Sequence, residues 1–198
     1  MKVYLITSDM KDENIWLEKI ERILKSGIDY IQYRDKLNST AVKYSTAKKL
    51  KKLCDKYKTP LIINNNLDLC LAVEAHGVHL GKKDMPIAIA RKILGPDKII
   101  GASARTLEDM HEYEKSGANY FGSGALFETQ TKKDAVLISK EKLIELTSNT
   151  SLPVFAIGGI KENNAHTLRN TGISGICISS ALMNSESPEK FIQKIKQI

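Results

Sequence analysis

Short apolar segments alternate strictly with amphipathic segments along the chain, and this alternation most constrains the fold. The apolar segments, which are typical of strands, cover residues 3–7, 30–34, 61–64, 77–81, 99–103, 119–124, 154–159 and 175–180. The segments with helical periodicity cover residues 14–27, 41–57, 67–75, 86–94, 106–116, 140–148, 162–171 and 188–197. Strands that alternate with helices in this way predict an α/β fold with a parallel sheet covered by helices.

The number of repeats favours a closed sheet. Segments such as LIIN (61–64) are apolar on successive residues, as expected for strands buried on both faces. Eight strand-helix repeats fit a compact (β/α)8 TIM barrel of eight parallel strands, and the alternative is an open doubly wound sheet. With 198 residues the chain is close to the lower limit for a barrel, so we expect a single domain spanning 1–198 with few insertions.

The formal net charge of +7 is compatible with binding to nucleic acid or to an anionic small molecule. Much of the excess lies in KKLKKLCDKYK (48–58), where helical spacing turns the lysines toward solvent. No nucleic-acid-binding motif and no interleaved aromatic residues accompany these lysines, so we expect no nucleic-acid partner. A site for a phosphorylated small molecule remains open.

Neither membrane insertion nor disulfide bonding is indicated. No apolar run approaches the ~18 residues that a membrane span needs, and the N-terminal segment lacks a signal-peptide layout. We therefore expect a cytoplasmic protein without membrane contact. Cys54, Cys70 and Cys177 share no CxxC spacing, which predicts buried free thiols rather than a disulfide framework or a zinc site.

Polar residues gather where the predicted strands end, which is where barrel enzymes carry their catalytic groups. The second strand ends in Gln32, Arg34 and Lys36, which alternate with other residues and so share one face of an extended segment. The planar fork of an arginine and the point charge of a lysine suit a polyphosphate. The alternative is that both cations pair with Asp35 and neighbouring acids.

A second anion site is predicted at the ends of the last two strands, AIGGI (156–160) and GICISSA (175–181). Glycines let the backbone approach a ligand closely. In barrels the loops after the seventh and eighth strands, with a short helix N-terminus, form a frequent phosphate site. The alternative is that Gly158 and Gly159 only make a turn.

Four other stretches carry candidate polar groups that also have a purely structural interpretation. In ETQTKKDA (128–135), Thr129, Thr131 and Lys132 could contact a phosphate or form a solvated loop. Asp84 in GKKDMP fits a helix N-cap before Pro86 better than a metal ligand.

His79 in GVHLG is predicted to be a core or lining histidine, because no second histidine stands at ligand spacing. The amides in LIINNN (61–66) are compatible with a turn or with a ligand site.

Seven motifs, in this order along the chain, carry a resemblance to a known superfamily. They are QYRDK, INNNLDLC, GVHLGKKDMP, IIGASART, YFGSGALFETQTKKDA, AIGGI and GICISSALM. Along almost its whole length it resembles the superfamily of thiamine-phosphate synthase (thiamine-phosphate pyrophosphorylase) and thiazole tautomerase. The resemblance implies a (β/α)8 barrel that joins hydroxymethylpyrimidine diphosphate to thiazole phosphate with the help of Mg²⁺. Diphosphate leaves first, and the thiazole nitrogen then attacks the pyrimidine cation.

The resemblance also implies roles for individual residues. The diphosphate ligands would be Arg34, Lys36, Asn64 and Lys132, and Gln32 would line the pyrimidine pocket. Other substrate contacts would come from Ser103, Thr129 and Thr131. The thiazole phosphate would be held by Gly159, Ser179 and Ser180, and the Mg²⁺ ligands would be Asp84 and Asn65. Among these residues, the ones expected to be catalytic are Arg34, Lys36, Ser103 and Lys132.

Three positions depart from the family pattern. Asn65 stands where the family usually has a metal-binding Asp, which should weaken Mg²⁺ binding because an amide oxygen carries no charge. Arg105 stands in place of a usual His, and Glu128 in place of a usual Pro. Synthase activity is the leading hypothesis.

The alternatives are a thiazole-phosphate tautomerase-like paralogue and a non-catalytic binder of thiamine or thiazole phosphate. The tautomerase hypothesis is weakened because Arg105 cannot act as a general base. The sequence is compatible with a homo-oligomer and leaves the oligomeric state open.

Overall fold

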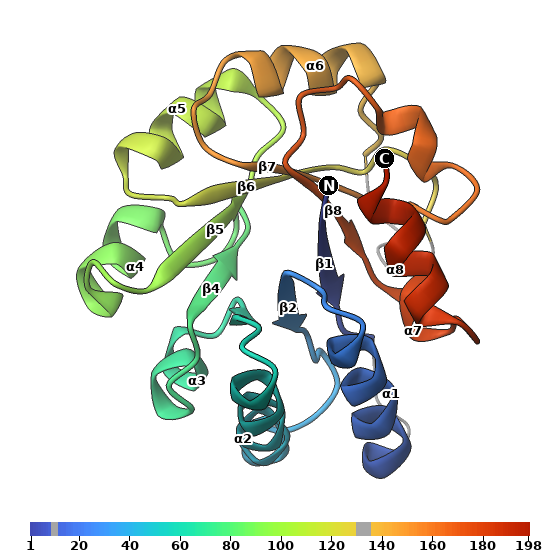
Figure 1. Ribbon diagram of the computed structural model, residues 1–198. Coiled ribbons are helices and arrows are strands. Elements are labelled where there is room, and N and C mark those ends of the chain that lie inside the picture. Colours follow the sequence, from blue (N-terminus) through green and yellow to red (C-terminus); the bar gives the residue numbers. More distant parts are fainter. Residues whose placement is uncertain (9–11, 130–135) are drawn as a thin grey trace.

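A closed barrel of eight parallel strands, paired in sequence order, forms the centre of the molecule (Figure 1). The computed structural model describes residues 1–8, 12–129 and 136–198. The strands are β1 (Lys2–Ile6), β2 (Tyr30–Tyr33), β3 (Leu61–Asn64), β4 (Gly77–Leu80), β5 (Ile99–Ser103), β6 (Tyr120–Gly124), β7 (Val154–Ile157) and β8 (Gly175–Ile178). Because β8 pairs with β1, the barrel prediction is confirmed and the open sheet is wrong.

Helices surround the strands, as Figure 1 shows. They are α1 (Glu13–Lys25), α2 (Thr40–Lys56), α3 (Leu67–Ala72), α4 (Ile87–Leu94), α5 (Leu107–Lys115), α6 (Lys140–Ser148), α7 (Ser180–Met183) and α8 (Pro188–Lys196). Seven of them match a predicted helix closely. The short α7, directly after β8, is not one of the helices predicted from periodicity.

The predicted helix at 162–171 is wrong, because only a 3-10 turn, η1 (Ala165–Leu168), forms there. Asn164 explains the difference. Its side chain accepts a hydrogen bond from the Lys161 N–H at 2.7 Å and donates to the Gly159 carbonyl at 3.0 Å. An amide that bonds nearby backbone groups competes with helix formation.

Two cores lie on opposite sides of the sheet. Outward strand residues pack against the helices in the larger core. Inside the barrel a smaller core contains Tyr4, Ile6, Ile62, Tyr120, Phe155 and Cys177. The Phe155 ring meets Tyr4 and Tyr120 edge to face, each at a centroid distance of 5.5 Å. Gly101 makes room for this layer, because a Cβ there would lie 2.0 Å from the Tyr120 ring.

The predictions about thiols and lysines are confirmed. Cys54, Cys70 and Cys177 are free and buried. The lysines of α2 lie mostly on its exposed side, where Lys49 pairs with Glu13 and Lys56 with Glu21. Among the helices that the structure describes, none is long and apolar enough to cross a membrane.

Candidate active site

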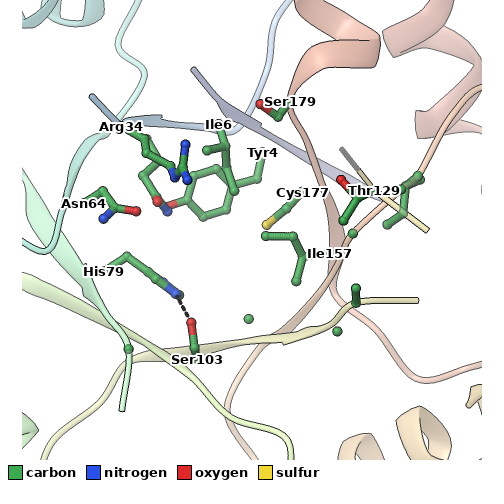
Figure 2. Close-up of a pocket in the computed structure, with 18 of the residues that line it drawn as sticks. Tyr4, Ile6, Arg34, Asn64, His79, Ser103, Thr129, Ile157, Cys177 and Ser179 are labelled. Carbon is green, nitrogen blue, oxygen red and sulfur yellow. Dashed lines mark hydrogen bonds between the residues drawn. The ribbon is translucent and has the colours of Figure 1, made fainter. Parts of the chain in front are cut away.

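A cavity of about 570 Å³ lies at the carboxyl ends of the barrel strands, which is the face that carries active sites in this fold. Every strand contributes to its lining, from β1 to β8 through Ile6, Gln32, Asn64, His79, Ser103, Gly124, Ile157 and Cys177. Figure 2 shows Arg34 and Asn64 on one side of this cavity, and Ser179 and Thr129 on the other. The predicted residues that the structure describes therefore meet in one site.

Arg34 and Lys36 follow β2 and line the cavity. The backbone of Arg34 is fixed to the end of β1, because its N–H donates to Thr7 Oγ1 at 3.0 Å. Neither Arg34 nor Lys36 forms an ion pair with a residue that the structure describes. Two cations at a cavity wall that have no counter-ion in the described part of the chain favour an anionic ligand.

Asp35 is not the partner of these cations, so the alternative interpretation is wrong for Asp35 and for every other acid that the structure describes. Its carboxylate accepts hydrogen bonds from the Tyr33 hydroxyl at 3.0 Å and from the Asn38 side chain at 2.9 Å. It also accepts from the backbone N–H groups of Leu37 and Asn38. Burial opposes ionisation of Asp35, but these donors hold the pKa of its carboxyl below the usual range.

The three amides after β3 have different roles. Asn64 ends the strand and lines the cavity with Asn65. Asn65 has a left-handed backbone with φ of 65°, a conformation that Asn adopts more readily than most residues. Its N–H donates to the His79 carbonyl at 3.0 Å, which ties it to β4. Asn66 is the N-cap residue of α3.

The predicted N-cap role of Asp84 is wrong. The N-cap residue of α4 is Pro86, and the Asp84 carboxylate instead accepts from the Gly81 N–H at 2.6 Å. The carboxylate thereby closes the turn after β4 and brings Asp84 to the cavity wall. The local sequence could not distinguish an N-cap from the bond to Gly81, because in both arrangements the Asp84 carboxylate accepts from a nearby backbone N–H.

The cavity rim on this side offers oxygen ligands from Asn64, Asn65 and Asp84. Within the described part of the chain there is no group of three or more His, Cys, Asp or Glu side chains that could hold a metal by itself. Mg²⁺ prefers oxygen ligands and is often bound through one or two carboxylates together with substrate phosphates. One carboxylate and two amides fit Mg²⁺ that arrives with a phosphorylated ligand.

His79 lies in a hydrogen-bonded chain across the barrel interior. Gln32 Nε2 donates to the Tyr4 hydroxyl at 3.1 Å, and Tyr4 contacts the Tyr120 hydroxyl at 2.8 Å. Tyr120 contacts His79 Nδ1 at 3.0 Å, and His79 Nε2 contacts Ser103 Oγ at 2.9 Å (Figure 2). Burial lowers the pKa of His79 to about 4, so the ring is neutral near pH 7.

The predicted lining role of His79 is confirmed, but the sequence analysis missed Tyr4 and Tyr120. A usable signal was present. Each of the predicted strands VYLIT (3–7) and NYFGSG (119–124) contains one of these tyrosines. Alternate side chains of a barrel strand face the interior, so each tyrosine was a candidate for an interior position.

The opposite side of the cavity is built from glycines and serines. Gly158 and Gly159 have φ of 100° and 64°, and a Cβ on Gly159 would lie 2.4 Å from the Glu128 carbonyl oxygen. The glycines therefore make a turn and also allow close contact with the loop after β6. Ser180 lines the same wall.

Ser179 has the clearest sign of a missing partner. Among the described residues, its Oγ is the one buried side-chain oxygen or nitrogen without a hydrogen bond. Buried polar groups normally have a partner, and an exception at a cavity wall suggests a ligand. This observation favours the predicted phosphate site over a turn alone.

The remaining predicted residues come from the loop after β6. Thr129 lines the cavity, whereas Thr131 and Lys132 lie outside the described residues. Arg105 and Lys161 also line the cavity. Lys161 was missed, although it directly follows the AIGGI motif.

Comparisons with known proteins identify relatives along the whole chain. Residues 3–182 match the family model described as thiamine monophosphate synthase. The chain is 43% identical to a thiamine-phosphate synthase of Clostridium acetobutylicum, over 93% of this chain and 88% of that protein. It is 41% identical to one of Methanobrevibacter smithii, over 96% and 90%. A solved thiamine phosphate pyrophosphorylase from Pyrococcus furiosus superposes with a TM-score of 0.86 at 36% identity, over 99% and 94%.

Proposed function

Because this chain belongs to the thiamine monophosphate synthase family and is a transferase of thiamine biosynthesis, we propose that its cavity holds two phosphorylated substrates at opposite ends. The pyrimidine diphosphate lies on the β2–β3 side and the thiazole phosphate on the β7–β8 side. The proposal is carried by two groups on opposite walls of one cavity that lack partners among the described residues: the cations Arg34 and Lys36, which form no ion pair, and the buried Ser179 hydroxyl, which has no hydrogen bond. We place the reaction in the cytoplasm, and the three free thiols agree with that compartment.

On the diphosphate side, we assign the leaving group to Arg34, Lys36 and Asn64, with Lys132 from the loop after β6. The absence of a described counter-ion supports this assignment for Arg34 and Lys36. Their charges favour the diphosphate most as it departs, because its negative charge then increases.

Mg²⁺, when bound by Asp84 and the amide oxygen of Asn65, would add positive charge near the departing diphosphate.

On the other side, we assign the thiazole phosphate to Gly159, Ser179 and Ser180. The buried hydroxyl of Ser179, which has no hydrogen-bond partner among the described residues, supports this assignment. Gly159 leaves room for the loop that carries Thr129, and Thr129 lines the same cavity. Both substrates are then held in one cavity, which replaces a bimolecular encounter by a bound geometry.

The central wall is neutral, and it suits a reaction that forms a cation without a strong base. Gln32, Ser103 and Thr129 contact the pyrimidine and the thiazole in our assignment. Arg105 lines the cavity at the position where a tautomerase would need a proton-transferring histidine. An arginine stays protonated and cannot accept that proton, so the structure favours the synthase over the tautomerase.

The direct test is an assay of purified protein with hydroxymethylpyrimidine diphosphate, thiazole phosphate and Mg²⁺. We expect stoichiometric release of diphosphate and thiamine phosphate. Isomerisation of a thiazole carboxylate phosphate without pyrimidine would instead identify a tautomerase. Tight binding of thiamine phosphate with no turnover, even at high enzyme and metal concentrations, would identify a binding protein and contradict the synthase.

Asn65→Asp should raise the affinity for Mg²⁺ in the presence of diphosphate about tenfold, because it adds a charged oxygen at the cavity rim. The left-handed backbone at Asn65 tolerates Asp, so the fold should be retained. Calorimetric titration of Mg²⁺ into protein saturated with inorganic diphosphate measures the change. Asn66→Asp is the control, since it adds the same charge one residue away at an exposed N-cap. Equal Mg²⁺ affinities in the two variants would remove Asn65 from the metal site.

A further inference from the structure

The hydrogen-bonded chain through Gln32, Tyr4, Tyr120, His79 and Ser103 joins two walls of the cavity. Gln32 and Ser103 line the cavity from β2 and β5. The two tyrosines are buried within the smaller core and connect them. The two tyrosine hydroxyls and the histidine ring each have two partners in this series of hydrogen bonds. Each group can accept from one partner and donate to the other, so the direction of donation at one end determines the direction at the other end.

The direction follows from the amide of Gln32. An amide nitrogen only donates, so the Tyr4 hydroxyl accepts from it and gives its own proton to Tyr120, 2.8 Å away. Tyr120 then donates to His79 Nδ1. A neutral imidazole that accepts at one nitrogen carries its proton on the other, so Nε2–H donates to Ser103 Oγ.

This direction gives both ends a defined chemistry toward the cavity. Ser103 accepts from the chain and keeps its own hydrogen for a ligand. Gln32 uses its nitrogen within the chain and keeps its carbonyl oxygen for a ligand. Rotating the Gln32 amide by half a turn would reverse every donor, and Ser103 would then present only lone pairs.

The proposed substrate distinguishes these two directions. An aminopyrimidine offers an amino N–H as donor and ring nitrogens as acceptors. An oxopyrimidine offers a carbonyl acceptor where the amino group was, and the neighbouring ring nitrogen carries a hydrogen. The amino compound therefore fits an accepting Gln32 and a donating Ser103, and the oxo compound fits the reverse.

We propose that Tyr4, Tyr120 and His79 are positioning residues that couple the two ends of this hydrogen-bonded chain, so that Ser103 donates to a ligand when Gln32 accepts from it, and so select an aminopyrimidine against an oxopyrimidine. The inference rests on the proposed function, because it assumes a pyrimidine diphosphate in this cavity. The selection arises from polar groups that the wrong ligand would leave unpaired, a mismatch that enzymes discriminate strongly.

Calorimetry with the diphosphates of the amino- and oxopyrimidine tests the selection. Wild-type protein should bind the amino compound about a hundredfold more tightly. Tyr120→Phe removes the donor to His79 Nδ1, so the ring is no longer held in one tautomer and the ratio should fall about tenfold. Tyr30→Phe is the matched control, because Tyr30 packs on Tyr4 and Tyr120 but has no hydroxyl bond among the described residues. Its ratio should equal that of the wild type.

A spectroscopic measurement on the free protein tests the direction without any ligand. In ¹⁵N-histidine-labelled wild type, His79 should show one tautomer with the proton on Nε2, and Tyr120→Phe should show a mixture. The His79 signals are assigned by their loss in His79→Gln. If circular dichroism shows that Tyr120→Phe does not fold, Tyr4→Phe interrupts the chain one step earlier and should shift the ratio in the same direction.

The outcomes separate this inference from the proposed function. A wild type that binds neither diphosphate overturns the proposed function. A wild type that binds both equally, or a Tyr120→Phe ratio equal to that of the wild type, overturns the selection by the chain. A proton on Nδ1 of His79 overturns the direction of donation.

Discussion

Arg34→Ala should lower kcat/KM for the pyrimidine diphosphate about a hundredfold, the loss expected when a charged donor to the leaving group is removed. The large effect follows from the lack of an ion pair between Arg34 and the described residues, which leaves its charge available to the diphosphate. The KM for the thiazole phosphate should change little, because that substrate is assigned to the opposite side of the cavity (Figure 2). Steady-state kinetics with each substrate varied in turn measures both quantities.

Two variants control for the removal of charge and for the shape of the side chain. Arg22→Ala removes the same charge from α1, where Arg22 pairs with Glu189 at the surface, and should leave the kinetics unchanged. Arg34→Lys keeps the charge but loses the planar fork, so its activity should fall between those of the wild type and Arg34→Ala. If Arg34→Ala raised only the KM for the thiazole phosphate, the assignment of the two ends would have to be reversed.

Gly159→Ala should raise the KM for the thiazole phosphate about a hundredfold. A Cβ at this position would lie 2.4 Å from the Glu128 carbonyl oxygen and 2.7 Å from that of Phe127, so the loop must move away. A displacement of this size at a substrate-positioning segment is enough for such a loss. Binding of inorganic diphosphate at the other end should be retained, which calorimetry can verify.

Gly95→Ala separates loop displacement from backbone strain. Gly95 also has a positive φ, of 73°, but a Cβ there would meet nothing within 4 Å. This variant should lose some stability and keep the thiazole phosphate KM of the wild type. An equal rise of KM in both variants would show that strain, and not the contact with the loop after β6, weakens binding.

The sequence predicted the barrel well because its strands are short, apolar and regularly spaced. It failed at 162–171, where the side chain of Asn164 bonds two nearby backbone groups and limits the segment to one 3-10 turn. It also missed α7, because a helix of four residues has too few positions to show a period.

The site was predictable where position along a strand determines which way a side chain points. Gln32, Asn64 and Ser103 stand at strand ends and line the cavity as expected. The role of Asp84 was not predictable, because its bond to Gly81 depends on the turn that both residues form.

The chain through Tyr4 and Tyr120 was not predictable either. It joins strands that are 116 residues apart in the sequence, and only the closed barrel brings the two hydroxyls to 2.8 Å.

The aromatic layer inside the barrel has a consequence for the competition between coupling and hydrolysis. The barrel interior beneath the cavity is filled by the aromatic rings of Tyr4, Tyr120 and Phe155, so the cavity is closed at that end. In the proposed reaction, water would then reach the pyrimidine cation from the side on which the substrates enter. In our proposal the thiazole phosphate shares this cavity with the cation, so a bound nucleophile also excludes the water that competes with it. The yield of coupled product per diphosphate released should therefore depend on thiazole occupancy at the moment of bond cleavage.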